Sequence, residues 1–357
     1  MAEHDVDVCL LSVGPDLPWL VGYEAMPLER LTMLVVPRDA DATLVVPRLE
    51  VPRVAERPEV FSIRGWGETE DPVAIVAELV GPVGRAAIGP RTWAQFLVAL
   101  QHEMPSTTFG TTAPVIGPLR AVKDDDEITA LCIAAAAVDR IAGALQAGEI
   151  PLVGRTEAEV SADLGRRILA EGHHRVNFAI VAAGENAASA HHEPGDRVIR
   201  RGEVVLCDFG GTYPTPTGAG YCSDITRCVV TGDTVPAEVA EVYAVLQEAQ
   251  AAGVAAGAPG TSCEAVDAAT RAVIADAGLG EWFVHRTGHG IGVEEHEDPY
   301  IVEGNATPLA PGHAYSVEPG IYLPGRFGMR LEDIVVTAPD GPRPLNHAVH
   351  DLVAVDA

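Results

Sequence analysis

Four acidic side chains stand inside runs of sequence that are otherwise apolar. Asp208 follows VVLC and precedes two glycines, and Asp224 lies in YCSDITRCVV. Glu318 and Glu332 occupy similar positions in SVEPGIY and RLEDIVV, which look like strands. A buried carboxylate must be paired, hydrogen-bonded or bound to a metal, because an isolated charge is too costly to bury. Each residue alone has a simpler explanation, namely a strand-end turn for Asp208 and an ion pair with a nearby arginine for the others.

Three histidines follow one another in the glycine-rich segment HRTGHGIGVEEHE. They are His285, His289 and His296. The interleaved glycines argue against a helix and for backbone that passes close to another part of the molecule. A lone histidine is usually structural, whereas three in one such segment favour a functional site.

Together, the four carboxylates and an imidazole are difficult to satisfy by ion pairs alone, because carboxylates are rarely buried without partners and nearby cations are few. Two divalent cations would neutralise them at once. Oxygen ligands with one nitrogen suit Mn(II), Co(II) or Zn(II), and bridging carboxylates hold two such ions about 3.5–4 Å apart. The pattern therefore predicts a dinuclear site of the kind that carries out hydrolysis.

Two domains are expected to position these residues, because 357 residues exceed the usual size of one core. Residues 6–112 alternate strand-like and helical runs, which predicts an α/β domain, with a hairpin turn at RDAD. The boundary lies in GPLRAVKDDDEI, where Gly117 and Pro118 are expected to break the structure and a helix begins near Glu127 and runs to about Ala147. Beyond it, the helical runs TEAEVSADLGRRILAEG and AEVAEVYAVLQEAQAAG alternate with strand-like runs, which predicts an α+β domain.

The composition is that of a soluble globular protein, with 47% apolar and 21% charged residues. A net charge of −27 would repel phosphate and anionic lipid, which disfavours nucleic acid and membrane partners.

The start shows no signal peptide. The apolar helix from Ile128 carries Asp139 and Arg140 in its middle, so we expect a buried helix and no membrane span. Six cysteines without a CxxC pair indicate reduced thiols and a cytoplasmic location.

In this order, CDFGG, SDITR, GHGIG, EPGIY and RLED resemble the motifs of the pita-bread metallopeptidases, which include aminopeptidase P, prolidase and, more distantly, methionine aminopeptidase. The resemblance covers the whole chain. It implies an α/β N-terminal domain of the creatinase/prolidase type at 1–120 and an α+β pita-bread catalytic domain at 121–357. Methionine aminopeptidases lack such an N-terminal domain, so the resemblance favours the proline-directed enzymes.

The resemblance also implies a role for each motif residue. Asp208 would chelate one metal ion, and Asp224 and Glu332 would bridge both. His289 and Glu318 would complete the other metal site. Glu318 would in addition take a proton from the water that the two ions share and return it to the leaving nitrogen.

Four further residues are implied to line the active site without being principal ligands, namely His191 of SAHHEPGDR, His285, His296 and Arg330. His285 would stabilise the oxyanion, and His296 would hold the proline end of the substrate. A dipeptide has a free carboxylate that needs a cation, and Arg330 with His296 could bind it.

The expected activity is hydrolysis of the imide bond before proline in dipeptides or short peptides, with manganese favoured and cobalt or zinc as alternatives. The stretch FGGTYPTPTGAGYCS is longer than this turn usually is in the family, and we expect a loop at the rim of the site that affects substrate preference. Dipeptidase and aminopeptidase P both stay open. A hydrolase or lyase of a small non-peptide molecule, or a metal-free peptide-binding module, are the alternatives, and retention of all five ligands disfavours the module. A homodimer is the expected assembly.

Overall fold

The computed structural model describes residues 1–356 and divides the chain into two compact units. The first unit comprises Met1–Arg120 and Thr215–Gly220, and the second comprises Ala121–Pro214 and Tyr221–Ala357. The tip of the long FGGTYPTPTGAGYCS stretch therefore belongs to the first unit. Its expected position at the rim of the active site stays a prediction.

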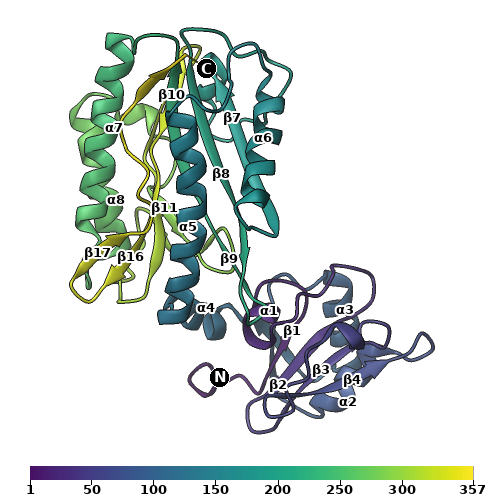
Figure 1. The fold of residues 1–357 in the computed structure, drawn as a ribbon. Helices are drawn as coiled ribbons and strands as arrows, with labels where there is room; N and C mark the ends of the chain where they lie inside the picture. Colours follow the sequence, from purple (N-terminus) through teal and green to yellow (C-terminus); the bar gives the residue numbers. More distant parts are fainter. Residues whose placement is uncertain (357) are drawn as a thin grey trace. The chain divides into compact units, whose positions relative to one another are not determined.

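The first unit is built on one mixed six-stranded sheet with the order β4-β3-β2-β1-β5-β6 (Figure 1). Its strands are β1 (Val8–Leu11), β2 (Met33–Pro37), β3 (Ala42–Pro47), β4 (Phe61–Trp66), β5 (Arg85–Ile88) and β6 (Thr108–Thr111). Its helices are α1 (Asp16–Val21), α2 (Pro72–Val80), α3 (Ala94–Glu103) and α4 (Ala113–Ala121), with short 3-10 turns at Ala2–His4 and Val51–Arg53. β2 and β3 are antiparallel neighbours on either side of RDAD, which confirms the predicted hairpin and the α/β character of this segment.

The segment that joins the units differs from the prediction in one respect. Gly117 and Pro118 do not break the structure, because both lie inside α4. Pro118 removes one intrahelical hydrogen bond, which a short helix tolerates near its end. The following helix begins at Asp125, slightly before the predicted start, because Asp124 Oδ1 accepts from the backbone N–H of Glu127 while the Glu127 carboxylate accepts from the backbone N–H of Asp124. This reciprocal capping box defines the helix start.

Four helices belong to the second unit, and one of them was not predicted. They are α5 (Asp125–Gln146), α6 (Glu157–Ala170), α7 (Ala237–Ala256) and α8 (Cys263–Asp276). The buried face of α8, the unpredicted helix, includes Asp267 and Thr270 beside Val266 and Ile274. Polar residues on the inner face interrupt the apolar periodicity that would have revealed the helix.

The second unit contains two five-stranded sheets and a hairpin (Figure 1). The first sheet has the order β18-β10-β8-β7, with β9 paired to β8, and comprises β7 (Arg175–Ala183), β8 (Val204–Pro214), β9 (Gly220–Cys222), β10 (Ile225–Thr231) and β18 (Val353–Val355). The second has the order β12-β11-β13-β16-β17 and comprises β11 (Gly288–Gly290), β12 (Glu297–Ile301), β13 (Ala314–Val317), β16 (Asp333–Ala338) and β17 (Gly341–Pro344). The hairpin is formed by β14 (Gly320–Leu323) and β15 (Phe327–Arg330), and 3-10 turns occur at Gly184–Ala188 and Gly280–Trp282.

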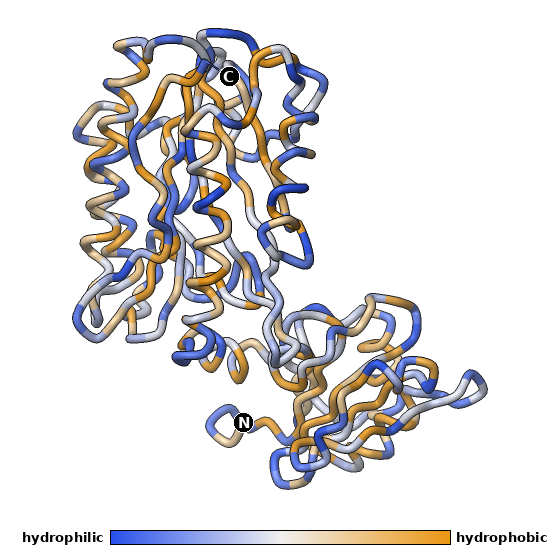
Figure 2. Tube along the Cα trace, viewed as in Figure 1, coloured by the Kyte–Doolittle hydropathy of each residue, from blue (hydrophilic) through white to orange (hydrophobic). Residues whose placement is uncertain are grey.

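Alternation along β8 decides which side chains face which layer. Val205 and Cys207 pack in the cluster formed with α5 and α6, whereas Val204 and Leu206 pack in the cluster formed with α7 and the β14-β15 hairpin. Because successive strand residues point to opposite faces, Asp208 shares the face of Leu206. Figure 2 shows hydrophobic residues along much of the strands and helices within each unit and hydrophilic residues in many connecting turns.

Helix α5 is the one helix among residues 1–356 that is long and apolar enough to cross a membrane, judged by length and composition only. Half of its most apolar window is buried in the protein. Val138, Ile141 and Leu145 pack in the core shared with α6 and β8, which agrees with the expected buried helix. All six cysteines are free thiols, also as expected.

Candidate metal centre

Strands β8 and β10 place two aspartates on one face of their sheet. Asp208 lies within β8 and is opposite Thr226 of β10 in the antiparallel register. Asp224 precedes β10 and is two residues from Thr226, so it shares that face. The two aspartates are only 8% and 3% exposed. The strand pairing therefore buries two carboxylates in the same layer.

The two glutamates stand where strands are interrupted, and not inside continuous strands as predicted. Glu318 lies in the break between β13 and β14, and Glu332 lies in the break between β15 and β16. β13 pairs with β16 and β14 pairs with β15, so the two breaks lie side by side. An interruption releases a side chain from the strict alternation of the pleat. Both glutamates can thereby approach the carboxylates of the other sheet.

Close packing of the backbone explains the glycines on either side of His289. A Cβ atom at Gly288 or at Gly290 would overlap a neighbouring backbone carbonyl, which confirms the predicted close approach. His289 Nε2 lies 3.1 Å from Glu318 Oε1 and 3.8 Å from Asp224 Oδ2. β11 thus brings the imidazole between carboxylates from both halves of the unit.

Three buried carboxylate oxygens in this cluster have no hydrogen-bond partner, namely Asp208 Oδ1, Asp224 Oδ1 and Glu332 Oε1. Potential ligand atoms of Asp224, His289 and Glu332 also lie within 4.8 Å of one another. Native proteins rarely leave buried polar atoms unsatisfied, and carboxylate oxygens with one imidazole nitrogen are suitable ligands for Mn(II) and related cations. The donor set therefore fits divalent metal ions.

The pKa values of the four carboxylates also favour the binding of cations. Burial raises the pKa of Asp224 and Glu332 well above their ordinary values, and the neighbouring carboxylates raise it further. Burial also raises the pKa of Asp208, although Arg330 opposes the effect. For Glu318, burial is outweighed by the hydrogen bond and charge of His289, which lower the pKa to about 2. Bound cations would keep all four groups ionised.

Arg330 is engaged by protein groups behind the carboxylates. Its Nη2 donates to Asp208 Oδ2, its Nη1 donates to Tyr322 OH at 2.7 Å, and its Nε donates to Thr226 Oγ1 at 3.1 Å. The side chain is 3% exposed. These contacts hold Arg330 in the network that orients Asp208, and its expected contact with a substrate carboxylate stays a prediction.

Two members of this network were not predicted from the sequence. Thr226 Oγ1 donates to Glu332 Oε2 at 2.6 Å, and Tyr322 OH lies between Arg330 and His285. Thr226 could have been predicted, because it stands two residues after Asp224 in a strand-like run, and alternate residues of a strand lie on the same face. No comparable pattern distinguishes Tyr322 from other core aromatic residues.

Both ring nitrogens of His285 have protein partners. Nδ1 lies 2.7 Å from Arg286 O, and Nε2 lies 2.8 Å from Tyr322 OH. A carbonyl oxygen only accepts, so Nδ1 carries the proton and Nε2 accepts from Tyr322. Burial lowers the pKa of His285, which favours this neutral form. A direct role at the oxyanion would require Nε2 to change its partner and stays a prediction.

His296 lies beside the cluster and remains exposed to solvent. Its ring centroid is 3.8 Å from that of His289, and its Nδ1 is 3.2 Å from Arg286 Nη2. Partial burial of its ring against His289, with smaller contributions from the charges of His289 and Arg286, lowers the pKa of His296 to about 4. A neutral His296 accepts at Nδ1 from Arg286 and presents an N–H at Nε2.

The loop that carries His191 is anchored through the next residue. His192 Nε2 lies 2.7 Å from Glu157 Oε2, and Asn186 and the backbone N–H of Ala183 donate to the same carboxylate. The Glu157 side chain is completely buried. His191 itself is exposed, and it makes a small contribution to lowering the pKa of His285 and His296. The structure thus brings every predicted site residue into one region of the second unit.

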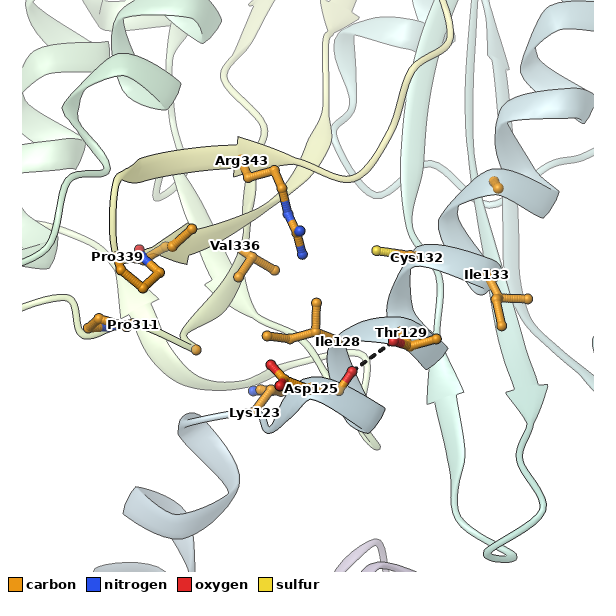
Figure 3. Close-up of a pocket in the computed structure, with 14 residues that line it drawn as sticks. Lys123, Asp125, Ile128, Thr129, Cys132, Ile133, Pro311, Val336, Pro339 and Arg343 are labelled. Atoms are coloured by element: carbon orange, nitrogen blue, oxygen red, sulfur yellow. Dashed lines mark hydrogen bonds between the residues drawn. The ribbon is translucent and has the colours of Figure 1, made fainter.

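A pocket of about 680 Å³ lies elsewhere in the second unit, between the first turns of α5 and the β16-β17 hairpin (Figure 3). Ile128, Cys132 and Val336 form part of its wall, and Arg343 extends over it. None of the five candidate metal ligands lines this pocket. It is therefore separate from the candidate metal centre.

Comparisons with known protein families agree with this geometry. The family described as metallopeptidase family M24 matches residues 128–339, and the creatinase/prolidase N-terminal domain matches residues 1–122. The first match contains all five candidate ligands, and the second covers nearly all of the first compact unit.

Individual relatives are similar over almost the whole chain. A probable dipeptidase, PepE, of Mycobacterium tuberculosis (strain ATCC 25618 / H37Rv) is 42% identical over 356 residues, which cover 97% of this chain and 91% of that protein. The crystal structure of dipeptidase PepE from Mycobacterium ulcerans matches with a TM-score of 0.90 at 42% identity, covering 99% of this chain and 94% of that chain. A recombinant prolidase from Thermococcus sibiricus matches with a TM-score of 0.91 at 35% identity, covering 99% and 96%.

Proposed function

Because the chain belongs to metallopeptidase family M24, we propose that it hydrolyses dipeptides at the imide bond before proline with the help of two divalent metal ions. The dependence on metal ions is supported by the three buried carboxylate oxygens that have no hydrogen-bond partner. The relatives named dipeptidase and prolidase support the substrate class. Manganese is the metal we favour, with cobalt or zinc as alternatives.

The five ligands in this proposal are Asp208, Asp224, His289, Glu318 and Glu332. Asp224 and Glu332 would be the bridging pair; burial raises the pKa of both well above normal, and the charge of Glu332 is the largest electrostatic contribution at Asp224. When bound, the ions would lower the pKa of water toward neutrality and offset negative charge that develops on the substrate.

Several side chains of this chain have separate tasks in the proposed reaction. Glu318, which accepts from Ser316 Oγ at 2.9 Å and has a low pKa, is ionised and can take a proton and return it to the proline nitrogen. Arg330 and Thr226 hold the carboxylates of Asp208 and Glu332 in place. His296 would contact the proline end of the substrate from the exposed side of the cluster.

We also propose a homodimer in the cytoplasm, without nucleic acid or membrane partners. Closed two-fold symmetry is the commonest arrangement of soluble oligomers. The net charge of −27 supports the exclusion of polyanionic partners. Sedimentation analysis of the purified protein measures the assembly directly.

Elemental analysis combined with peptide hydrolysis tests the proposed function. We expect about two ions per chain, loss of activity on chelation, and recovery on addition of Mn(II). Ala-Pro should be cleaved faster than Ala-Ala, which has an ordinary peptide bond. Full activity in metal-free protein would overturn the metal-dependent reaction, and equal rates on the two dipeptides would overturn the preference for proline. Turnover of a non-peptide substrate alone would favour the alternative small-molecule hydrolase.

A further inference from the structure

The pocket between α5 and the β16-β17 hairpin is separate from the metal centre and has no part in the proposed reaction (Figure 3). Its volume of about 680 Å³ is in the usual range for small-molecule sites, roughly 300–1,000 Å³. The hairpin forms one wall, where Val336 and Pro339 line the pocket. The other wall is a single face of α5, because its members recur every three or four residues, namely Asp125, Ile128, Thr129, Cys132, Ile133 and Ala136. Both walls therefore present apolar side chains.

Strand register places Arg343 over this apolar surface. In the antiparallel pair of β16 and β17, Arg343 lies directly opposite Val336, and residues paired in this way have side chains on the same face. Val336 is 1% exposed, whereas Arg343 is exposed and extends from the hairpin over the pocket. Arg343 forms no ion pair with an acidic side chain among residues 1–356. Its positive charge is therefore available to an anionic group of a ligand.

An acidic side chain stands on the opposite wall. Asp125 is exposed in the first turn of α5, and its carboxylate has no hydrogen bond or ion pair among residues 1–356. The helix start does not depend on it, because Asp124 and Glu127 form the capping box. Lys123 also lines the pocket, but its ammonium is buried and paired with Glu297 at 2.7 Å. Within residues 1–356, the pocket thus has one unpaired carboxylate and one unpaired guanidinium on opposite walls.

A ligand that satisfies both charges must carry an ammonium and a carboxylate on one small molecule. A simple carboxylate would leave Asp125 unpaired and be repelled by it, and a simple amine would leave Arg343 unpaired. The planar fork of a guanidinium matches a carboxylate with two parallel hydrogen bonds, and an ammonium donates to a carboxylate. The apolar walls additionally favour a ligand with an apolar side chain.

We propose that this pocket binds a free α-amino acid with an apolar side chain, with its carboxylate at Arg343 and its ammonium at Asp125. The side chain then packs against Ile128 and Val336. The site goes beyond the proposed peptidase reaction and does not depend on it, although free amino acids are what cleavage of a dipeptide releases.

The thiol of Cys132 provides a local probe of this pocket. It points from α5 toward the hairpin, and Cys132 is the one cysteine of the six that is not buried. We expect L-leucine to slow the alkylation of Cys132 by iodoacetamide, followed by mass spectrometry, in Mn(II)-loaded and metal-free protein alike. Leucinamide lacks the carboxylate and 4-methylpentanoate lacks the amine. Each should bind about 5-fold more weakly than leucine, the scale of a partly exposed ion pair.

Substitutions at the two charges assign each contact. Arg343→Met should remove the difference between leucine and leucinamide, and Asp125→Asn should remove the difference between leucine and 4-methylpentanoate. Arg200→Met and Asp126→Asn are the matched controls, because both residues are exposed and neither lines the pocket. Calorimetric titration measures the same affinities without use of the thiol.

Equal protection of Cys132 by the three compounds, no protection by leucine, or unchanged affinities in the Arg343 and Asp125 variants would overturn the proposal. Loss of protection on removal of Mn(II) would also overturn it, because leucine would then bind at the metal centre. A second copy of the chain over the pocket would make Cys132 react slowly without ligand and faster on dilution, and this result too would refute an amino-acid site. Hydrolysis of Ala-Pro is measured separately, so failure of the proposed peptidase activity would leave these results unchanged.

Discussion

Replacing Thr226 by valine tests whether the residues behind the carboxylates control the metal centre. The change replaces the hydroxyl by a methyl group at a completely buried position. That hydroxyl donates to Glu332 Oε2 at 2.6 Å and accepts from Arg330 Nε at 3.1 Å. Both partners are charged, so valine leaves a carboxylate oxygen and a guanidinium N–H without their shared neighbour.

The expected magnitude follows from these two bonds. A hydrogen bond to a charged group contributes about 1.5–3 kcal/mol, and loss of a residue that orients a metal ligand typically lowers metal affinity roughly 10- to 100-fold. We therefore expect Thr226→Val to weaken Mn(II) binding by roughly 10- to 100-fold, or about 1.4–2.8 kcal/mol. Thr226→Ser is the matched control, because it keeps the hydroxyl and removes one methyl group, at a cost to folding of about 0.8 kcal/mol.

Calorimetric titration of the metal-free proteins with Mn(II), together with their melting temperatures, provides the assay. Thr226→Ser should bind metal almost as the wild type does, whereas Thr226→Val should bind weakly even at temperatures where it is fully folded. Equal affinities in Thr226→Val and the wild type would refute the reasoning. So would equal losses in the valine and serine variants, because the hydroxyl would then be irrelevant.

Three further predictions concern the same centre and its support. Asp224→Ala should lose both ions and Asp208→Ala chiefly one, and a count near two ions in Asp224→Ala by elemental analysis would contradict the bridge. The fold raises the pKa values of Asp224 and Glu332, so the native state binds more protons than the unfolded state. The metal-free protein should therefore lose stability as the pH rises above the ordinary pKa values of these groups, near 3.8 and 4.5. Bound Mn(II) should remove that loss, so the difference in melting temperature between loaded and metal-free protein should widen from about pH 5 to 8, and a constant difference would argue against it. Lys123, the only lysine, forms a buried ion pair with Glu297 at 2.7 Å. Lys123→Met should lower the free energy of unfolding in urea by about 3–5 kcal/mol, and adding Glu297→Gln should restore part of it.

Several features could be derived from the sequence because they depend on short stretches of chain. The hairpin at RDAD, the capping box at the start of α5 and the glycines around His289 each reflect local backbone requirements. The four carboxylates could be recognised as acidic residues within apolar runs, because a buried carboxylate without a partner is energetically unfavourable and therefore rare. Helix α8 escaped detection because Asp267 and Thr270 lie on its buried face.

The resemblance of five short motifs to the pita-bread enzymes led to the correct family, while the roles of individual residues stay predictions. The order of the five motifs along the chain helped to identify the family, because the ligands come from successive strands that pack together. Sequence alone placed Glu318 and Glu332 inside strands, however, whereas each stands in an interruption. Interruptions depend on how two neighbouring strand pairs align, and that alignment is not a local property.

By itself, the sequence determined the family, the division into an α/β segment followed by an α+β segment, and which residue types could bind metal. Only the tertiary structure decided which partners those residues have. Arg330 and Asp208 are separated by 122 residues, and Thr226 and Glu332 by 106, yet each pair shares a hydrogen bond. These contacts bury Arg330, whereas Arg286 is half-buried and lies against His296 and Tyr300, a difference that two arginines in polar, glycine-containing motifs do not reveal. Hydrogen bonds between distant segments depend on sheet register and on the packing of one layer against another, and neither is encoded in the spacing of any single motif.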